Sequence, residues 1–331
     1  MALPESIGEG RHRPALRLVE TKSLRRDDWL EVRKNGIGGS DAAAAVGLNP
    51  YMSALELWLI KTGRDANLPK PDADDMTEPV YWGTLLEPIV AASYTKQTGN
   101  KVRRVNAVLQ HPTLSWMLAN IDREVVGNRE VQLLECKTAG EFGARLWRDG
   151  VPEYVQLQVQ HQLAVTGKQA ADVAVLLCGQ KLEVHRVVRD DALIARLIEL
   201  EAAFWQFVET DTPPPADGSE SADRALRCLY PGAGGTVDFT GDRTLSAAFA
   251  DLVAVRAEIN ARQQVEAKLK QSIQQAMGEA DRAIFETGEV SFKRSKDSAG
   301  VDLKRLLADH PHLAAQYAIT KPGSRRFLVS T

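Results

Sequence analysis

Hydrophobic residues recur along the first 212 positions with two different periods, one typical of helices and one typical of strands. Helical spacing, capping residues and glycine stops predict a short alanine-rich helix ending at Gly47 and longer helices over 24–34, 53–63, 79–98, 154–166 and 190–210. Alternating or continuous apolar runs predict strands over 101–109, 116–126, 131–138, 172–177 and 182–188. Helices followed by intermixed strands and helices indicate an α/β domain.

A proline-rich stretch divides the chain, because Pro213-Pro214-Pro215 stiffens a spacer and cannot continue a helix. Four parts are therefore expected: a flexible arm over 1–20, a main domain over 21–212, a linker over 213–220 and a helical and small β module of unknown role over 221–331. Within the last part, two apolar stripes over 243–279 are separated at Gln263-Gln264. This interruption favours one long helix or a helical hairpin over a sustained coiled coil.

Composition limits the possible classes of protein without identifying one. With 44% hydrophobic and 26% charged residues, the 331-residue chain is typical of a globular protein of two domains. The apolar stretches are too short for a membrane span, and three scattered cysteines favour a reducing cytoplasm. The net charge of −3 does not indicate a nucleic-acid binder, although phosphate contacts need only local positive surface.

The predicted strand over 131–138 carries the main candidate chemistry. Side chains alternate between the faces of a strand, so Glu135 and Lys137 point to the same side. A hairpin would bring Asp122 beside Glu135, and two neighbouring carboxylates repel unless a hard cation such as Mg²⁺ neutralises them. Lys137 would then orient or polarise water for metal-assisted phosphodiester hydrolysis. The alternative is that this pattern is only a solvated strand face.

Two neighbouring segments add candidates to this site. Glu87 lies on a mostly apolar helical segment, where an unpaired charge would be costly, so it either joins the site or forms a surface ion pair. Gln158 and Gln162 share one face of the helix over 154–166, and a neutral amide there would steady Lys137 or the water. Surface polarity is the simpler explanation of these glutamines.

The ordered set of motifs resembles the YqaJ-type viral recombinase family, relatives of the phage lambda exonuclease in the PD-(D/E)XK nuclease superfamily. The matching pieces, over roughly residues 24–166, are Trp29-x-x-x-Arg33, Gly36-Ile-Gly-Gly-Ser-Asp41, Trp82-Gly83 through Glu87, Asp122, Glu135-Cys136-Lys137 and Gln158-Val-Gln160. The resemblance implies a restriction-endonuclease-like core, with a central mixed sheet flanked by helices, and a smaller α+β module at the C-terminus.

The resemblance also assigns roles around the metal. It implies that Asp122 and Glu135 coordinate Mg²⁺, with Mn²⁺ as a substitute, and that the Cys136 carbonyl is a further ligand. Glu87 would complete the site directly or through water. Lys137 would be the catalytic lysine and Gln158 its supporting amide, with Gln160 as the weaker candidate for that support.

By the same resemblance, Arg33 and Ser40 bind the 5′-phosphate of a DNA end and Trp29 shapes the pocket. A guanidinium makes paired hydrogen bonds to phosphate, and Ser40 stands where a helix begins. The alternatives are a core role for Trp29 and a capping role for Ser40. Asn120-Ile121 stands where some relatives have Ser-Pro, which puts phosphate contacts near that point in doubt.

The implied function is a Mg²⁺-dependent exonuclease that degrades one strand of a DNA duplex from its 5′ end. Its implied partners are duplex DNA ends, a phage single-strand annealing protein and further copies in a ring, all in the cytoplasm of a bacterial host of a phage or prophage. Three alternatives remain open: a PD-(D/E)XK endonuclease of restriction or junction-resolving type, a non-catalytic DNA-end binder and a structural phage protein. No sequence repeat or fibre-like composition favours the last.

Overall fold

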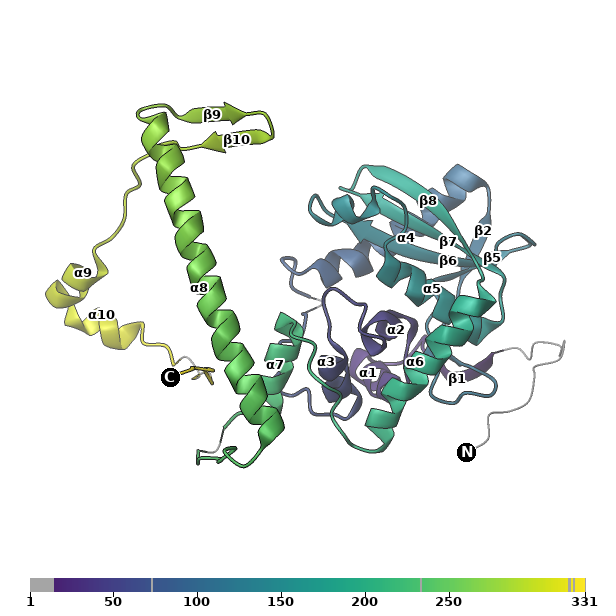
Figure 1. The fold of residues 1–331 in the computed structure, drawn as a ribbon. Helices are drawn as coiled ribbons and strands as arrows, with labels where there is room; N and C mark the ends of the chain where they lie inside the picture. Colours follow the sequence, from purple (N-terminus) through teal and green to yellow (C-terminus); the bar gives the residue numbers. More distant parts are fainter. Residues whose placement is uncertain (1–14, 73, 233, 321–322, 324, 331) are drawn as a thin grey trace. The chain divides into compact units, whose positions relative to one another are not determined.

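A computed structural model describes residues 15–330 except 73, 233, 321, 322 and 324. The chain forms two compact units, Met1–Pro231 and Gly232–Thr331 (Figure 1). The expected flexible arm lies largely outside the described residues. Its described end differs from the expectation, because residues 16–20 form a strand that pairs with a later strand of the first unit.

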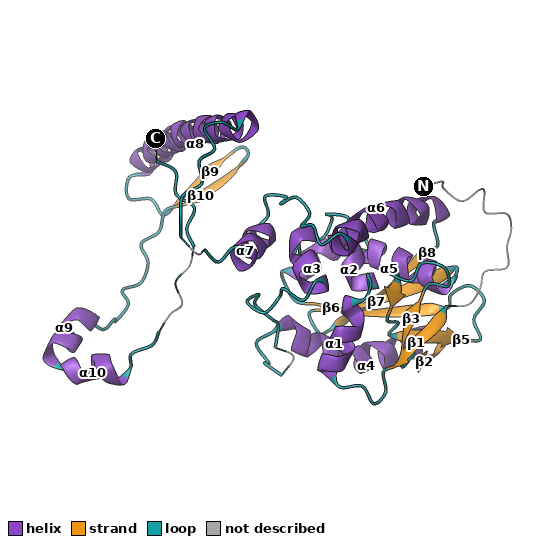
Figure 2. Cartoon of the chain, turned by 90° about the horizontal axis from the view of Figure 1, so that it is seen from below, coloured by secondary structure: helices purple, strands orange, loops and turns teal. Residues whose placement is uncertain are grey.

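The centre of the first unit is a five-stranded mixed sheet with the strand order β2-β5-β6-β7-β8 (Figure 2). Its strands are β2 (Lys101–Arg104), β5 (Arg123–Val126), β6 (Leu133–Ala139), β7 (Ala170–Leu177) and β8 (Lys181–Val188). Only the β6–β7 pair is parallel, and their connection contains a short 3-10 helix (Gly143–Trp147) and the helix α5 (Glu153–Thr166). The expected α/β core with a central mixed sheet flanked by helices is confirmed.

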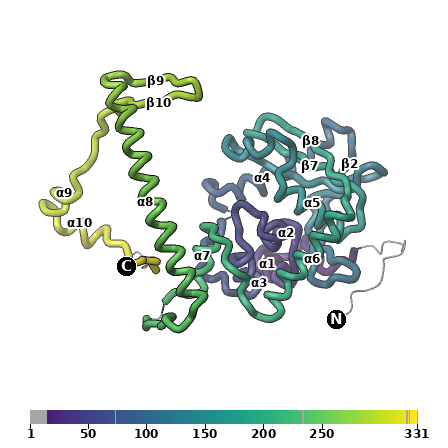
Figure 3. Tube along the Cα trace, in the orientation of Figure 1, coloured from purple at the N-terminus to yellow at the C-terminus, as the bar shows by residue number. Residues whose placement is uncertain are grey.

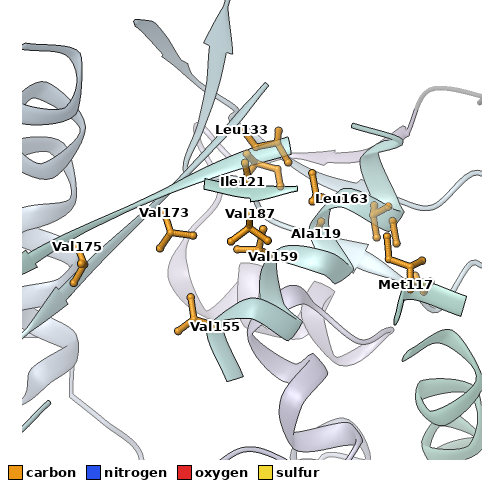
Figure 4. Packing of buried hydrophobic residues seen from close by; sticks show 14 of the residues in the cluster. Met117, Ala119, Ile121, Leu133, Val155, Val159, Leu163, Val173, Val175 and Val187 are labelled. Atoms are coloured by element: carbon orange, nitrogen blue, oxygen red, sulfur yellow. The ribbon is translucent and has the colours of Figure 1, made fainter. Parts of the chain in front are cut away.

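The two faces of this sheet pack against different helices because neighbouring strand residues point to opposite sides. Leu134 and Ala174 pack with α4 (Pro79–Thr98), whereas Leu133 and Val173 pack with α5 (Figure 4). The start of α6 (Asp191–Glu209) packs on the α5 side. Side chains on the α5 face of β6 therefore point toward this helix.

The N-terminal helices form a second layer of packing. They are α1 (Arg26–Lys34), α2 (Gly39–Ala45) and α3 (Ala54–Lys61). Ser53 caps α3 by accepting a hydrogen bond from the backbone N–H of Glu56 at 3.1 Å, as its sequence position indicates. Buried side chains of α2 and α3 pack with those of the C-terminal half of α6.

Two predicted strands are each divided in the structure. The segment expected as one strand over 101–109 forms β2 and β3 (Ala107–Gln110), and the segment 116–126 forms β4 (Leu118–Ala119) and β5. Each segment is divided because its two halves pair with strands of different sheets. The strands β3 and β4 join β1 (Leu16–Glu20) in a separate three-stranded sheet, while β2 and β5 join the main sheet. The interruption between β4 and β5 contains Asp122.

The boundary between the units lies after Pro231 rather than at the expected linker over 213–220. The helix α7 (Glu220–Leu229) follows that linker but packs on α3. The Ser221 hydroxyl donates to Glu56 at 2.6 Å, and Arg224 forms an ion pair with the same carboxylate at 3.0 Å. These contacts of α7 assign it to the first unit.

The second unit is dominated by α8 (Arg243–Met277), drawn in green in Figure 3, which confirms one long helix over most of 243–279. A hairpin of β9 (Arg282–Phe285) and β10 (Gly288–Ser291) follows, and then the short helices α9 (Leu303–Asp309) and α10 (Pro311–Gln316). None of the helices in the described residues is long and apolar enough to span a membrane.

Candidate active site

Glu135 and Lys137 lie two residues apart on β6 and face α5. The Lys137 Nζ atom lies 2.7 Å from Glu135 Oε1, and Glu135 retains only 4% of its exposure. Burial acts to lower the pKa of Lys137, but the neighbouring carboxylates outweigh burial and raise it. Lys137 is therefore held as an ammonium group beside a buried carboxylate.

Asp122 reaches the same place from the interruption between β4 and β5. Its Oδ2 atom accepts a hydrogen bond from the backbone N–H of Cys136 at 2.8 Å, which fixes the carboxyl group against the strand between Glu135 and Lys137. Burial and the negative charge of Glu135 raise the pKa of Asp122 to about 8. The structure thus brings together two carboxyl groups that repel each other, as expected from the sequence.

Two glutamines of α5 hold Glu135 in place. The Gln158 Nε2 group donates to Glu135 Oε1 at 2.6 Å, and Gln162 Nε2 donates to Glu135 Oε2 at 2.8 Å. The Gln158 Oε1 atom also accepts from Lys137 Nζ at 2.9 Å. Gln160 points elsewhere, because its amide bonds to the Val188 carbonyl and the Asp190 N–H. The amide that contacts Lys137 is that of Gln158.

Glu87 lies near this group but has its own partner. Arg123 Nη1 lies 2.5 Å from Glu87 Oε1 and also donates to the backbone carbonyl of Asp122 at 2.6 Å. Among the described residues, no three acidic, histidine or cysteine side chains are gathered closely enough to hold a metal ion. The structure therefore pairs Asp122 with Glu135 and leaves Glu87 in an adjacent ion pair.

The carboxyl pair fits a divalent cation by the chemistry of its donors. Both groups are hard oxygen ligands, the kind that Mg²⁺ prefers. Within the described part of the chain, Oδ1 of Asp122 has no hydrogen-bond donor, so one oxygen of that group is available as a ligand. A cation would also relieve the repulsion that raises the pKa of Asp122.

A second polar cluster contains the predicted phosphate-binding residues. Arg33 Nη2 donates to the Ser40 hydroxyl at 2.6 Å and to Asp41 Oδ1 at 3.0 Å, and its guanidinium lies 4.7 Å from the centre of the Trp29 ring. Lys61, whose side chain is 2% exposed, donates to Asp41 Oδ2 at 2.7 Å and to the Arg33 carbonyl at 2.8 Å. Arg33, Ser40 and Trp29 are thus brought together as the sequence predicts.

The charged groups of this cluster stabilise one another. Burial alone would raise the pKa of Asp41, but the positive charges of Lys61 and Arg33 outweigh burial and hold it well below its usual value. The side chain of Arg33 keeps 21% of its exposure, whereas that of Lys61 is buried. The guanidinium of Arg33 is therefore the cation of this cluster that solvent can reach. Such a guanidinium can receive an anion from solvent.

The two clusters are adjacent because α2 packs closely on α5. A Cβ atom at Gly39 would lie 3.1 Å from Gln162 Cγ and 3.3 Å from the Gln158 carbonyl oxygen. Glycine therefore allows the backbone beside Ser40 to approach the helix that carries Gln158. This contact joins the Arg33 cluster to the carboxylate site.

Four residues of the two clusters were not assigned from the sequence. Gln162 was considered with Gln158 as an amide on the same helix face, but its hydrogen bond to Glu135 was not predicted. Lys61 follows six residues of α3 that are almost entirely apolar, which could have indicated a buried lysine. The contact of Asp41 with Lys61 joins residues 20 positions apart, and that of Arg123 with Glu87 joins different elements, so neither contact has a local signal.

Comparison with known proteins shows a family similarity over part of the first unit. Residues 28–169 match the YqaJ-like viral recombinase domain. The uncharacterized protein YqaJ of Bacillus subtilis (strain 168) is 40% identical over 217 residues, which cover 64% of this chain and 66% of that protein, slightly less than two thirds of its length.

Two solved structures are also similar to this chain. One is an alkaline exonuclease (LHK-Exo) from Laribacter hongkongensis, with 25% identity, a TM-score of 0.46 and coverage of 56% of this chain and 93% of that chain. The other is a phage related exonuclease from Haemophilus somnus 129PT, with 11% identity, a TM-score of 0.41 and coverage of 55% and 97%. The family match over residues 28–169 and the Bacillus relative show that this part of the chain is similar to the YqaJ-like viral recombinase family.

Proposed function

We propose that the first unit is a Mg²⁺-dependent nuclease that hydrolyses DNA from duplex ends, in the 5′ to 3′ direction. The observation that carries the proposal is the convergence of Asp122, Glu135 and Lys137, with the Cys136 N–H holding Asp122 and the Gln158 amide joining the other two. Two carboxylates and an ammonium group at one place are the parts required for metal-assisted phosphodiester hydrolysis.

Asp122 and Glu135 are the residues that would hold the cation, with the Cys136 carbonyl as a further ligand and Glu87 acting through water. The bound cation would supply positive charge against the phosphate. Release of Glu87 from Arg123 would be needed for direct coordination, and their 2.5 Å contact favours the indirect role.

Lys137 and Gln158 act on the attacking water and the phosphate in this proposal. The ammonium group of Lys137 offsets the negative charge that develops on the phosphate and orients the water beside it. Gln158 keeps Lys137 at the edge of the strand by accepting one of its three N–H bonds. The remaining ammonium protons are then directed toward Glu135 and toward the substrate.

The Arg33 cluster supports a preference for 5′-phosphate ends. Arg33 uses Nη2 to contact Ser40 and Asp41, and its Nε and Nη1 groups make no hydrogen bond to the described residues. These groups and the Ser40 hydroxyl would bind a terminal phosphate, while Trp29 covers one face of the guanidinium. A fixed end-binding site beside the hydrolytic site gives a physical reason for cleavage to begin at an end.

The proposed biological role rests on the resemblance to this family rather than on the geometry of the site. Degradation of one strand would expose single-stranded DNA for a phage annealing protein and so serve recombination. A ring of several copies around the duplex would keep the enzyme on its substrate. Both are part of the proposal.

The proposal is tested by incubating the protein and Mg²⁺ with matched duplexes that carry a 5′-phosphate, a 5′-hydroxyl or no end because the DNA is a closed circle. Hydrolysis is expected on the linear duplexes, faster with the 5′-phosphate, and absent on the circle. Cleavage of the circle would instead indicate an endonuclease. Binding to ends without hydrolysis in Mg²⁺ or Mn²⁺ would indicate a non-catalytic end binder.

A further inference from the structure

The 35-residue helix α8 exposes an apolar stripe along its length. At 1.5 Å per residue the helix is about 52 Å long, and none of its residues is buried. Val255 is 50% exposed, Ile259 52% and Leu269 62%. Helices in water gain most of their stability from the packing of an apolar face. We therefore expect this apolar face of α8 to pack against a partner.

The apolar residues of α8 follow a seven-residue repeat that begins at Leu245. In a coiled coil the first and fourth positions of each repeat, a and d, form the contact surface. Here these positions are Leu245, Ala248, Leu252, Val255, Ile259, Arg262, Glu266, Leu269, Ile273 and Ala276. Eight of the ten are apolar, and the two polar ones are neighbours at the middle of the series. Gln263 and Gln264 themselves lie outside positions a and d.

The charges of Arg262 and Glu266 at the centre of the stripe favour one kind of partner helix and one relative direction of the two helices. In a parallel pair of identical helices each position meets itself, which would place Arg262 on Arg262 and Glu266 on Glu266. In an antiparallel pair, the a positions of one helix contact the d positions of the other. Arg262 occupies a d position and Glu266 an a position. Arg262 of each copy can therefore face Glu266 of the other copy, which gives two such contacts by symmetry. We propose that α8 pairs antiparallel with α8 of a second copy of this chain, in the register that places Arg262 opposite Glu266 of the second copy.

This register is consistent along the rest of the stripe. It pairs Ile259 with Leu269, Val255 with Ile273 and Leu252 with Ala276 of the second copy, on both sides of the central charges. The shared segment runs from 252 to 276, a length of about 37 Å at 1.5 Å per residue. Each apolar contact residue in that segment meets an apolar residue.

The register also accounts for apolar residues beside the stripe. Phe249 and Val265 are 48% and 54% exposed and lie outside positions a and d. In the antiparallel register Phe249 lies beside Met277 of the second copy, and Val265 lies beside Val265 of the second copy. One unfavourable neighbour remains, because Arg256 lies beside Lys270 of the second copy at the rim, where charges are solvated.

The test is sedimentation equilibrium of the full-length chain carrying Arg262→Glu or Glu266→Arg. Either change places like charges at the centre of the antiparallel pair, so each variant alone is expected to associate at least about tenfold more weakly than the wild type. An equal mixture of the two variants is expected to restore association, because the opposite charges then meet between chains. Within each chain residues 262 and 266 still carry like charges, so recovery on mixing reports contact between chains.

The matched control is Arg256→Glu, which makes the same charge change on the same helix and removes the like-charged neighbour. This variant is expected to associate at least as tightly as the wild type. Helical content by circular dichroism is measured for all variants so that loss of the helix itself is recognised. Unchanged association of both single variants, or no recovery on mixing while the helix is retained, overturns the proposal.

Discussion

Gln158 accepts a hydrogen bond from Lys137 Nζ at 2.9 Å through its amide oxygen. Its amide nitrogen donates to Glu135 Oε1 at 2.6 Å. An ammonium group can only donate and a carboxylate can only accept, so one orientation of the amide satisfies both neighbours. The amide thereby fixes the lysine and the carboxylate relative to each other before any substrate arrives.

Gln158→Leu is expected to lower the turnover number at least about tenfold while leaving the affinity for DNA nearly unchanged, because it frees Lys137 without removing it. Gln156→Leu is the control on the same helix, since the side chain of Gln156 is exposed and donates to the Val151 carbonyl, away from Glu135 and Lys137. Steady-state rates and DNA binding are measured for both. Equal turnover of the two variants would contradict the positioning role of Gln158.

Lys137→Ala is expected to reduce hydrolysis at least about 100-fold and to leave DNA binding intact. The carboxylate pair and its hydrogen bonds to Cys136 and Gln162 remain in this variant. Lys168→Ala, at a half-exposed lysine that only approaches Glu124, is the control for loss of a positive charge. Turnover at the wild-type rate by the Lys137 variant would refute the assigned site.

Arg33→Ala is expected to reduce the ratio of rates on 5′-phosphorylated and 5′-hydroxyl duplexes toward one, because the paired hydrogen bonds to the phosphate are lost. Arg25→Ala removes an exposed arginine that pairs with Asp28 near the start of the same helix, and it should keep the wild-type ratio. The measurement is the two initial rates for each variant. An unchanged ratio in the Arg33 variant would exclude this pocket.

Lys61→Met is expected to destabilise the fold by about 3–5 kcal/mol, because it leaves Asp41 buried without its nearest positive partner. The double variant Asp41→Asn with Lys61→Met should recover part of that loss, since no unpaired buried charge remains. Urea unfolding monitored by tryptophan fluorescence gives both values. Additive losses in the double variant would show that the two side chains are not coupled.

His161 is expected to be positively charged at neutral pH. Its Nδ1 lies 2.8 Å from Glu201 Oε1 and its Nε2 lies 2.8 Å from the Leu118 carbonyl, and since both partners are acceptors, both ring nitrogens carry protons. Burial acts to lower the pKa of His161, but the Glu201 carboxylate outweighs burial and raises it.

Because the pKa of His161 is higher in the folded protein, its stabilising contribution is complete below its unfolded value of about 6.5. That contribution is lost as the pH rises through the folded pKa. Chemical shifts of the His161 ring across a pH titration measure that pKa directly. A titration midpoint below about 6.5 would contradict the ion pair with Glu201.

The elements that the sequence predicts well carry their own boundary signals. The bounds of α4 agree with the prediction because Pro79 begins the helix and Gly99, with φ of +76°, ends it. The common face of Glu135 and Lys137 follows from strand alternation alone. These features depend on neighbouring residues, which a single sequence displays.

The features that the sequence does not predict depend on distant partners. Whether the chain breaks before Asp122 is decided by which strands β4 and β5 join, and nothing in the local pattern specifies this. The pairing of Glu87 with Arg123 and of Asp41 with Lys61 likewise requires the packed fold. The assignment of α7 to the first unit depends on its contacts with Ser53 and Glu56.

The most direct test of the carboxylate site is the release of nucleotides from a linear 5′-phosphorylated duplex by the wild type and by Asp122→Asn, each with and without Mg²⁺. The wild type is expected to release nucleotides only with Mg²⁺, and Asp122→Asn is expected to release at least about 100-fold fewer in the same time. Release by the wild type without any divalent cation, or equal release by the variant, would contradict the account.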